Sequence, residues 1–346
     1  MNHSNYSSLM YCRYAEPDTY ITKAIKHSIF LAFGGLGIIA NILFIILAVN
    51  YTARKSLHFL IINMALADII VVIFQFWNYI EKNMISNDYN MWDDVDGIMA
   101  EVYCKTKAFF HFVAKSQPLV NLFIISIERY RVTRQTIQVS RPLSRKKRFA
   151  IISCCWLTPT VILSYQPLFY EYIKDPILKG YCELNWKNKM VSILQSVDLL
   201  FHVLLYILMV LLSILTLRSL TVVQPIESSL SEEQRLHRRK RIRGTVKMVL
   251  YSLLLFTCCY APNHIFATLQ DFKLVDGNYC IDRRTFRFIT WSVFPLVNAL
   301  FSPCIYCVCL TDFRDGARKM LCCTRNASAA RENVMPRAGR IQSTRM

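Results

Sequence analysis

Seven stretches of almost uninterrupted apolar sequence dominate this chain of 346 residues. Each is long enough to cross a bilayer core of roughly 30 Å, which takes about 20 helical residues. The fifth contains DLLFHVLLYILMVLLSILTL, which a half-exposed helix of a soluble domain would not carry. The sequence lacks the alternating segments of about ten residues that a membrane β-barrel needs. The predicted spans are 25–49, 57–80, 103–127, 149–170, 190–217, 246–269 and 286–310.

The composition agrees with a chain that lies mostly in lipid. Hydrophobic residues make up 54% of it and charged residues 18%, whereas soluble domains are about 45–50% apolar and about 25% charged. Its 21 Phe and 18 Tyr exclude a solvated, disordered chain. The connections between spans are short, so neighbouring spans pack together. We therefore expect an all-α membrane protein, a seven-transmembrane helix bundle.

The basic residues predict the orientation of this bundle. The loop after the first span, segments 129–148 and 218–247, and everything after residue 310 hold 26 of the 41 basic residues and six of the 23 acidic ones. Lys and Arg in short loops stay on the cytoplasmic side. The net charge of +18 therefore reflects topology and not a nucleic-acid surface. We expect a multi-pass protein of the plasma membrane with its amino terminus outside.

The topology divides the chain into four regions. Residues 1–24 are predicted to be extracellular, 25–310 to form the seven-helix domain, 311–323 an amphipathic eighth helix, and 324–346 a disordered cytoplasmic tail. The first region shows no apolar core with a cleavage site, so no cleaved signal peptide is expected. Its sequons at Asn2 and Asn5 are candidates for glycosylation, although such triplets also arise by chance. Cys322 and Cys323 are candidates for palmitoylation.

The 13 cysteines separate into two groups by topology. Nine lie in spans or on the inner side, where a buried cysteine usually acts as a small hydrophobe. The other four are outside, where an oxidising compartment allows three pairings that the sequence does not distinguish. Cys104 opens the third span and Cys182 lies in the middle of the loop between the fourth and fifth, so their pairing is the first expectation. Cys12 would then pair with Cys280.

Short motifs occur once in each of several spans and after the last one. Glu128-Arg129-Tyr130 ends the third span, 25 residues after Cys104. The other matches are Asn41, Asp68 within LADII, Trp156, Phe256-x-x-Cys259-Tyr260-x-Pro262, Ser302-Pro303-x-x-Tyr306 and Asp312-Phe313-Arg314. In this order, and over nearly the whole chain, they resemble the rhodopsin-like (class A) G-protein-coupled receptors, and the chain is similar to the peptide-receptor subgroup.

The resemblance implies roles for these positions. Glu128 and Arg129 would form a paired charge that opens on activation, and Pro262 would kink the sixth helix as it swings outward. Asp68, a costly carboxylate at mid-bilayer, would either hold an allosteric sodium ion or simply be hydrogen-bonded. No other cofactor is expected. The activation residues are Asp68, Glu128, Arg129, Tyr130, Pro262, Ser302, Pro303 and Tyr306, and the sodium ligands are Asp68, Asn298 and Ser302.

Several positions depart from the family pattern. Tyr260 replaces the usual sixth-helix tryptophan, and Ser302 replaces an asparagine. Pro118 stands where the family has a serine in the third helix, which removes one sodium ligand. The fifth span contains no proline, and Tyr206 aligns with that position. These departures affect the hydrogen bonding expected of the active state and not the fold.

Ionisable residues in the outer half of the bundle bear on the ligand. An amine receptor of the family would carry aspartate in place of His111, and an opsin would carry a lysine in the seventh span, which has none. Lys115 lies one turn below His111 on the same helix face. Lys115 and Asp198 either pair with each other or each awaits an oppositely charged ligand group. The candidate ligand-binding residues are Gln75, His111, Lys115, Asp198, Tyr260, Asn263, His264 and Trp291.

Two loops favour a peptide ligand. Residues 81–101 carry six acidic residues against one lysine, a rim that would steer cationic ligands or merely keep the outer face soluble. The loop KGYCELNW around Cys182 resembles the strand pair of the family's peptide receptors. Together they favour a short basic or amidated neuropeptide, with a small-molecule or lipid ligand as the alternative.

The expected function is therefore a receptor that activates heterotrimeric G proteins. Its other expected partners are arrestin and the lipid bilayer, and no nucleic acid is expected. The chain is not expected to be an enzyme, because catalytic sets such as HExxH and GxSxG are absent from the sequence. A transporter, the remote alternative, would show internal repeats or broken helices in matching halves, and the sequence shows neither.

Overall fold

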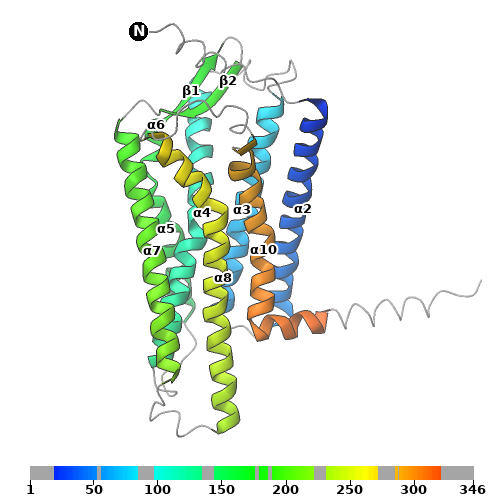
Figure 1. Ribbon diagram of the computed structural model, residues 1–346, viewed down its shortest axis with the longest axis vertical. Helices are drawn as coiled ribbons and strands as arrows, with labels where there is room; N and C mark the ends of the chain where they lie inside the picture. Colours follow the sequence, from blue (N-terminus) through cyan, green and yellow to red (C-terminus); the bar gives the residue numbers. More distant parts are fainter. Residues whose placement is uncertain are drawn as a thin grey trace, which may run out of the picture.

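The computed structural model describes residues 19–52, 56–84, 97–134, 144–175, 179–185, 189–221, 231–271, 285–286 and 288–320. Within these ranges, seven helices are long and apolar enough to cross a membrane, which confirms the seven predicted spans. They run side by side (Figure 1). Their bounds are α2 (Tyr20–Asn50), α3 (Ser56–Met84), α4 (Gly97–Arg134), α5 (Arg145–Ile162), α7 (Lys189–Thr221), α8 (Glu232–Asp271) and α10 (Phe294–Cys309), the last preceded by the π-helical turn η3 (Phe288–Val293).

Helix α4 is the central element of the bundle. It contacts α3, α5, α7 and α8, whereas α2 packs against α3 and α10. The indole N–H of Trp156 donates to Oδ1 of Asn63 (2.9 Å) and so joins α5 to α3. Helices α2 and α7 leave many large apolar side chains exposed, Ile39 and Leu204 among them. Such faces suit a bilayer, where the helical backbone satisfies its own hydrogen bonds and apolar side chains meet lipid.

A β-hairpin covers one end of the bundle, which we call the hairpin end (Figure 1). The short helix α6 (Gln166–Phe169) leads into β1 (Tyr170–Asp175), which pairs antiparallel with β2 (Lys179–Leu184). Tyr172 lies opposite Cys182 in this register. The strand pair expected around Cys182 is thus present.

A short helix over 311–320 lies across the opposite end of the bundle (Figure 1). Its Phe313 is fully buried and stacks on Phe44 of α2, with ring centroids 4.9 Å apart. The ring of Phe313 also meets His58 of α3 edge-on at 4.8 Å. This burial of one face explains why the amphipathic segment folds against the bundle.

Some element boundaries differ from those predicted. The predicted fourth span, 149–170, is divided by a turn at 163–165 into α5 and α6. Part of the basic loop predicted over 218–247 is helical, because α8 begins at Glu232, where the Ser231 Oγ accepts the Gln234 N–H (3.3 Å) as a helix cap. Hydropathy detects the lipid-embedded part of a helix and misses a charged extension beyond the membrane.

Several predictions lie outside the described residues. These are the pairing of Cys12 with Cys280, glycosylation at Asn2 and Asn5, and palmitoylation at Cys322 and Cys323. The side chains of Asn263 and His264 are likewise outside the described part of α8.

Candidate functional site

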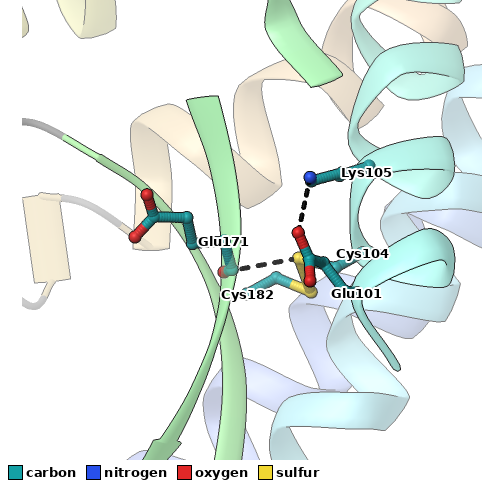
Figure 2. Close-up of a disulfide and its surroundings, with 5 residues drawn as sticks. All are labelled: Glu101, Cys104, Lys105, Glu171 and Cys182. Carbon is teal, nitrogen blue, oxygen red and sulfur yellow. Dashed lines mark hydrogen bonds and ion pairs between the residues drawn. A yellow bond between two sulfur atoms is a disulfide. The ribbon is translucent and has the colours of Figure 1, made fainter. Parts of the chain in front are cut away.

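A disulfide joins the hairpin to the bundle. Cys104 of α4 is bonded to Cys182 of β2, with their Cα atoms 5.6 Å apart, which confirms the first expected pairing (Figure 2). The Asn185 amide donates to Oε1 of Glu171 in β1 (2.8 Å) and braces the far side of the hairpin. Tyr170 of β1 faces Phe112 of α4, with ring centroids 6.2 Å apart. The hairpin is therefore held over the end of α4.

Lys115 lies inside the bundle, surrounded by aromatic rings. Its side chain is 8% exposed. The ammonium is 4.7 Å from the ring centroid of Tyr260 in α8 and 5.4 Å from that of Trp291 in η3. Phe112, one turn earlier on α4, contributes a third ring at 5.9 Å. These contacts bring together three helices, and Tyr260 and Trp291 were both predicted to neighbour Lys115.

Asp198 contacts a histidine of its own helix. Nδ1 of His202 lies 3.3 Å from Oδ1 of Asp198 and 2.7 Å from its carbonyl oxygen. Asp198 attracts Lys115 electrostatically, but among the described residues no carboxylate oxygen lies within 4.0 Å of the Lys115 ammonium. The direct Lys115–Asp198 pair, one of the two alternatives from the sequence, is therefore not formed. The i, i+4 spacing of Asp198 and His202 could have indicated this contact.

Gln75 satisfies a backbone carbonyl that proline leaves without a donor. Pro295 has no N–H to offer the carbonyl of Trp291, four residues earlier in the seventh span. The Gln75 side chain, 2% exposed, donates Nε2 to that carbonyl at 3.0 Å. Gln75 therefore holds α3 against η3, a structural contact that the sequence did not predict.

Asn41 of α2 likewise donates to a backbone carbonyl farther along the seventh span. Pro303 leaves the carbonyl of Ala299 without its helical donor, and Nδ2 of Asn41 donates to it at 2.8 Å. The same nitrogen also donates to the Gly37 carbonyl of its own helix (2.9 Å). This pair of bonds joins α2 to α10.

Asp68 is buried in the middle of the bundle, with 3% of its surface exposed. The amide of Asn298 in α10 donates to its Oδ1 at 3.5 Å. Ser302, one turn farther along α10, donates its hydroxyl to the Asn298 carbonyl (2.8 Å). The three predicted sodium ligands thus lie together between α3 and α10.

His111 and Tyr306 are both enclosed by the bundle. The His111 ring is buried and meets the rings of Phe74 and Phe112 edge-on, at 6.0 and 5.6 Å. Tyr306 is fully buried against Phe44, with ring centroids 5.3 Å apart. Its hydroxyl faces the sulfur of Met64 at 3.9 Å.

Arg129 lies at the opposite end of α4 from the hairpin. Its guanidinium is 3.7 Å from the carboxylate of Glu128, and both side chains are largely buried. Tyr130 is half-buried beside them. Nearby, Arg238 of α8 donates to the Val132 carbonyl of α4 at 3.1 Å. The end of α8 is therefore attached to the end of α4.

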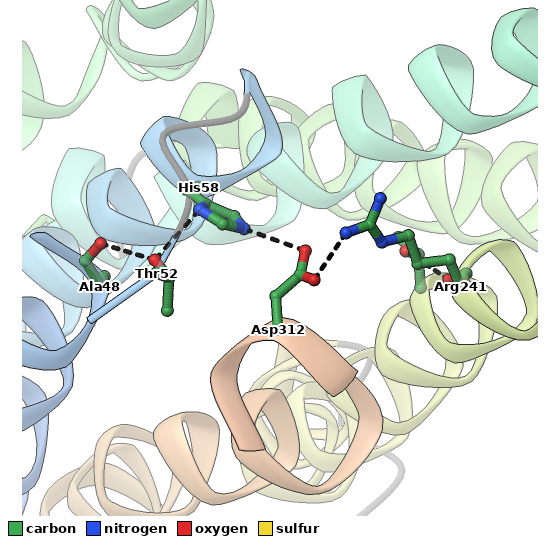
Figure 3. Close-up of polar contacts among 6 residues, drawn as sticks. Ala48, Thr52, His58, Arg241 and Asp312 are labelled. Atoms are coloured by element: carbon green, nitrogen blue, oxygen red, sulfur yellow. Dashed lines mark hydrogen bonds and ion pairs between the residues drawn. The ribbon is translucent and has the colours of Figure 1, made fainter. Parts of the chain in front are cut away.

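Asp312 connects three elements at this same end (Figure 3). Its Oδ1 accepts from Arg241 of α8 at 2.7 Å, and its Oδ2 lies 3.6 Å from Nε2 of His58 in α3. Nδ1 of His58 in turn lies 3.2 Å from the Thr52 hydroxyl. The sequence marked Asp312 as the start of an eighth helix but contained no signal for the Arg241 contact, because the partners are 71 residues apart.

Gly244 brings α8 against the end of α10. A Cβ at this position would lie 2.5 Å from the Cys309 carbonyl oxygen, so only glycine permits this approach. Gly244 is one turn after Arg241, and both contact the seventh span or the helix that follows it. We call Arg241, Gly244, Cys309 and Asp312 the α8 latch.

The geometry defines a class of protein. It is a seven-helix membrane bundle with a disulfide-bonded hairpin at one end and a buried, paired arginine at the other. Residues 40–306 match the family model described as 7 transmembrane receptor (rhodopsin family). The chain belongs to this family, whose members are receptors coupled to G proteins and not enzymes.

Curated relatives are named as peptide receptors. The chain is 24% identical to the tachykinin-like peptides receptor 99D of Drosophila melanogaster over 83% of its own length and 55% of that receptor. It is 23% identical to the substance-K receptor of Rattus norvegicus, over 82% of this chain and 70% of that one. It is 24% identical to the galanin receptor 2a of Danio rerio, over 83% and 73%. The chain therefore spans little more than half the length of the fly relative.

Proposed function

We propose that this protein binds a short extracellular peptide, basic or amidated, and in response activates a heterotrimeric G protein. One observation carries the proposal. Helix α4 runs without interruption from the disulfide at Cys104, past Lys115 and its aromatic neighbours, to Arg129. A single helix, with Pro118 inside it, thus connects a ligand-facing end with a signalling end. The peptide receptors among the relatives support the ligand class.

The same proposal sets the orientation. The hairpin end faces the cell exterior and the Arg129 end faces the cytosol, in the plasma membrane, as the segregation of basic residues predicts. In that orientation Asn2 and Asn5 are available for glycosylation. Endoglycosidase treatment should increase the gel mobility of the expressed chain, and the Asn2→Gln/Asn5→Gln variant should already migrate at the faster position.

Activation would act on α8. Pro262 lies inside this helix, where it removes a backbone hydrogen bond and permits bending. Outward movement of the α8 end would open the α8 latch and expose Arg129 to the G protein, and later to arrestin. Palmitates on Cys322 and Cys323 would anchor the helix over 311–320 to the membrane.

A sodium ion is a further proposal for the Asp68 cluster. Hard cations take oxygen ligands, and Asp68 offers a carboxylate and Ser302 a hydroxyl oxygen, whereas Asn298 presents its amide nitrogen to Asp68. Asp68 and Ser302 would hold the ion, which would supply a positive charge beside the buried carboxylate. Basal nucleotide exchange should then fall when sodium replaces potassium, and Asp68→Asn should abolish that difference.

An agonist screen tests the function as a whole. Cells expressing the chain are exposed to a peptide library while calcium, cyclic AMP and guanine-nucleotide exchange are recorded. Arg129→Ala should abolish exchange, and the matched control Arg131→Ala, an exposed arginine two residues farther on, should not. Responses to lipids or small molecules with silence across peptides would overturn the ligand class. Measured solute flux would overturn the receptor assignment.

A further inference from the structure

We propose that Lys115 binds a carboxylate of the ligand, so that the peptide, basic elsewhere, inserts one acidic group deep into the bundle. The inference rests on the proposed receptor function and specifies the chemistry of the same site. The carboxylate is either a free carboxyl terminus or an Asp or Glu side chain, which present the same group to the lysine.

Lys115 lies deep inside the bundle. It lies 11 residues after Cys104 on α4, a rise of about 16 Å below the disulfide. Only 8% of Lys115 is exposed, so its ammonium has lost most of its water. Ionisable side chains within membrane helices are rare and generally functional for this reason.

The aromatic rings compensate for only part of that loss. Tyr260, Trp291 and Phe112 present ring faces to the ammonium at 4.7, 5.4 and 5.9 Å. Cation–π attraction is weaker than the solvation that a buried ammonium gives up. Rings also stabilise the cation without neutralising it, so the site keeps a positive charge.

Among the described residues, no carboxylate pairs directly with this ammonium. Asp198 is the acidic residue that attracts Lys115 electrostatically, yet its carboxylate contacts His202. Within the described part of the chain, Lys115 makes neither a hydrogen bond nor an ion pair. A buried cation in an aromatic surrounding, without an anion of its own, is suited to an anion that arrives with an apolar body.

The backbone beside Lys115 points independently to a ligand site. Trp291 belongs to η3, a single π-helical turn in the seventh span, and such turns occur frequently at functional sites. Phe112, Trp291 and Tyr170 are only half-buried and form a series of ring contacts, 6.0 and 6.2 Å between centroids, from beside Lys115 up to the hairpin. A ligand that enters past the hairpin would meet these rings before the ammonium.

The proposed site adjoins α8. Tyr260 lies beneath the ammonium and packs on Phe256 of the same helix, with ring centroids 4.3 Å apart. A carboxylate that draws Lys115 away from Tyr260 would change the packing two residues before Pro262. Anion binding is thereby connected to the helix that activation moves.

The test compares an acid with its neutral isostere on the full chain. The unfolding temperature of the receptor in lipid nanodiscs is measured against increasing 3-phenylpropionate or 3-phenylpropionamide. We expect the acid to bind at least about tenfold more tightly, as for a hydrogen bond between charged groups. Equal stabilisation by both compounds, or by neither, would overturn the proposal without any variant.

Variants then assign the preference to Lys115. Lys115→Met should lose the preference for the acid, and Lys115→Arg should keep it. Lys107→Met is the matched control, since it removes the same charge from α4 beside the ring of Tyr103, 5.4 Å away, and it should keep the preference. Retention of the preference by Lys115→Met would contradict the assignment.

Variants of the active peptides distinguish the carboxylate site at Lys115 from peptide-receptor function. Active library peptides are prepared as free acids, as carboxyl-terminal amides, and with Asp and Glu changed to Asn and Gln. Loss of activity with one of these changes identifies the source of the carboxylate and supports the site. Activity of peptides that carry no carboxylate would overturn the site but leave the peptide receptor intact. A preference for the acid fragment in a chain that no peptide activates would support the site and overturn the peptide ligand.

Discussion

Two prolines in the seventh span provide hydrogen-bond partners for two buried side-chain amides. Pro295 and Pro303 each leave a carbonyl, of Trp291 and of Ala299, without the N–H that a regular helix would supply. Gln75 and Asn41 donate to these carbonyls from α3 and α2. An unsatisfied buried carbonyl is costly, so these amides stabilise the bundle through the backbone of their neighbour.

Replacing Gln75 should therefore destabilise the protein. Gln75→Met keeps most of the side-chain volume but leaves the Trp291 carbonyl unsatisfied, at a cost of about 1–3 kcal/mol. The unfolding temperature of the receptor in nanodiscs should fall. The control Gln195→Met changes the same residue type at a half-buried position where the amide makes no hydrogen bond to a described residue, and it should have little effect. An unchanged unfolding temperature for Gln75→Met would contradict this account.

At the residue scale, the sequence located the polar residues of the spans but not their contacts. The polar residues of the spans could be found because a polar group in an apolar helix stands out in any sequence. Their partners were not predictable, because Gln75 and Trp291 are 216 residues apart. Only the packing of α3 against η3 brings them together.

Helix α8 closes against the end of α10 through two neighbouring contacts. Gly244 permits backbone contact, and Arg241 forms the adjoining ion pair with Asp312. Both residues meet the end of α10 or the helix after it, away from the hairpin end, so both bear on the equilibrium between closed and open α8 and not on recognition.

Gly244→Ala should raise signalling without ligand. The new Cβ would overlap the Cys309 carbonyl oxygen, and a strain of about 1 kcal/mol in the closed state shifts a two-state equilibrium about fivefold. Basal guanine-nucleotide exchange should rise accordingly. Gly35→Ala on α2, where nothing lies within 4 Å of the added Cβ, should leave it unchanged. Equal basal exchange in the two variants would show that the contact does not restrain α8.

Removing the ion pair should act in the same direction and no more strongly. Arg241 and Asp312 are 39% and 25% exposed, and partly exposed pairs contribute about 1 kcal/mol or less. Asp312→Asn should raise basal exchange by up to about fivefold. Arg318→Gln breaks an exposed contact with Asp315 on the same short helix and should have no effect. Reduced basal exchange in Asp312→Asn would contradict the latch.

The disulfide acts at the scale of the whole molecule. It closes a loop of 78 residues that contains α5 and β1, and such crosslinks typically contribute about 2–4 kcal/mol. Cys182→Ser should lower both the unfolding temperature and the amount of receptor at the cell surface. Cys258→Ser, at an exposed free cysteine in α8, is the control. Normal stability of Cys182→Ser would show that the hairpin is held by its other contacts.

The sequence alone determined the number of spans, their order and the distribution of basic charge. Each of these follows from local composition, because a helix that crosses lipid needs about 20 consecutive, predominantly apolar residues. The hairpin around Cys182 and the Cys104–Cys182 bond were also predictable, from the cysteine positions and the resemblance of the loop.

Tertiary structure decided which groups meet. Lys115 faces three rings and not Asp198, Asp312 joins Arg241 and His58, and Gln75 completes the backbone of η3. These contacts depend on the rotation and approach of helices distant in sequence, to which side-chain packing contributes more than hydropathy. Periodicity reports which residues can lie in the membrane, and only the packed bundle sets which of them touch.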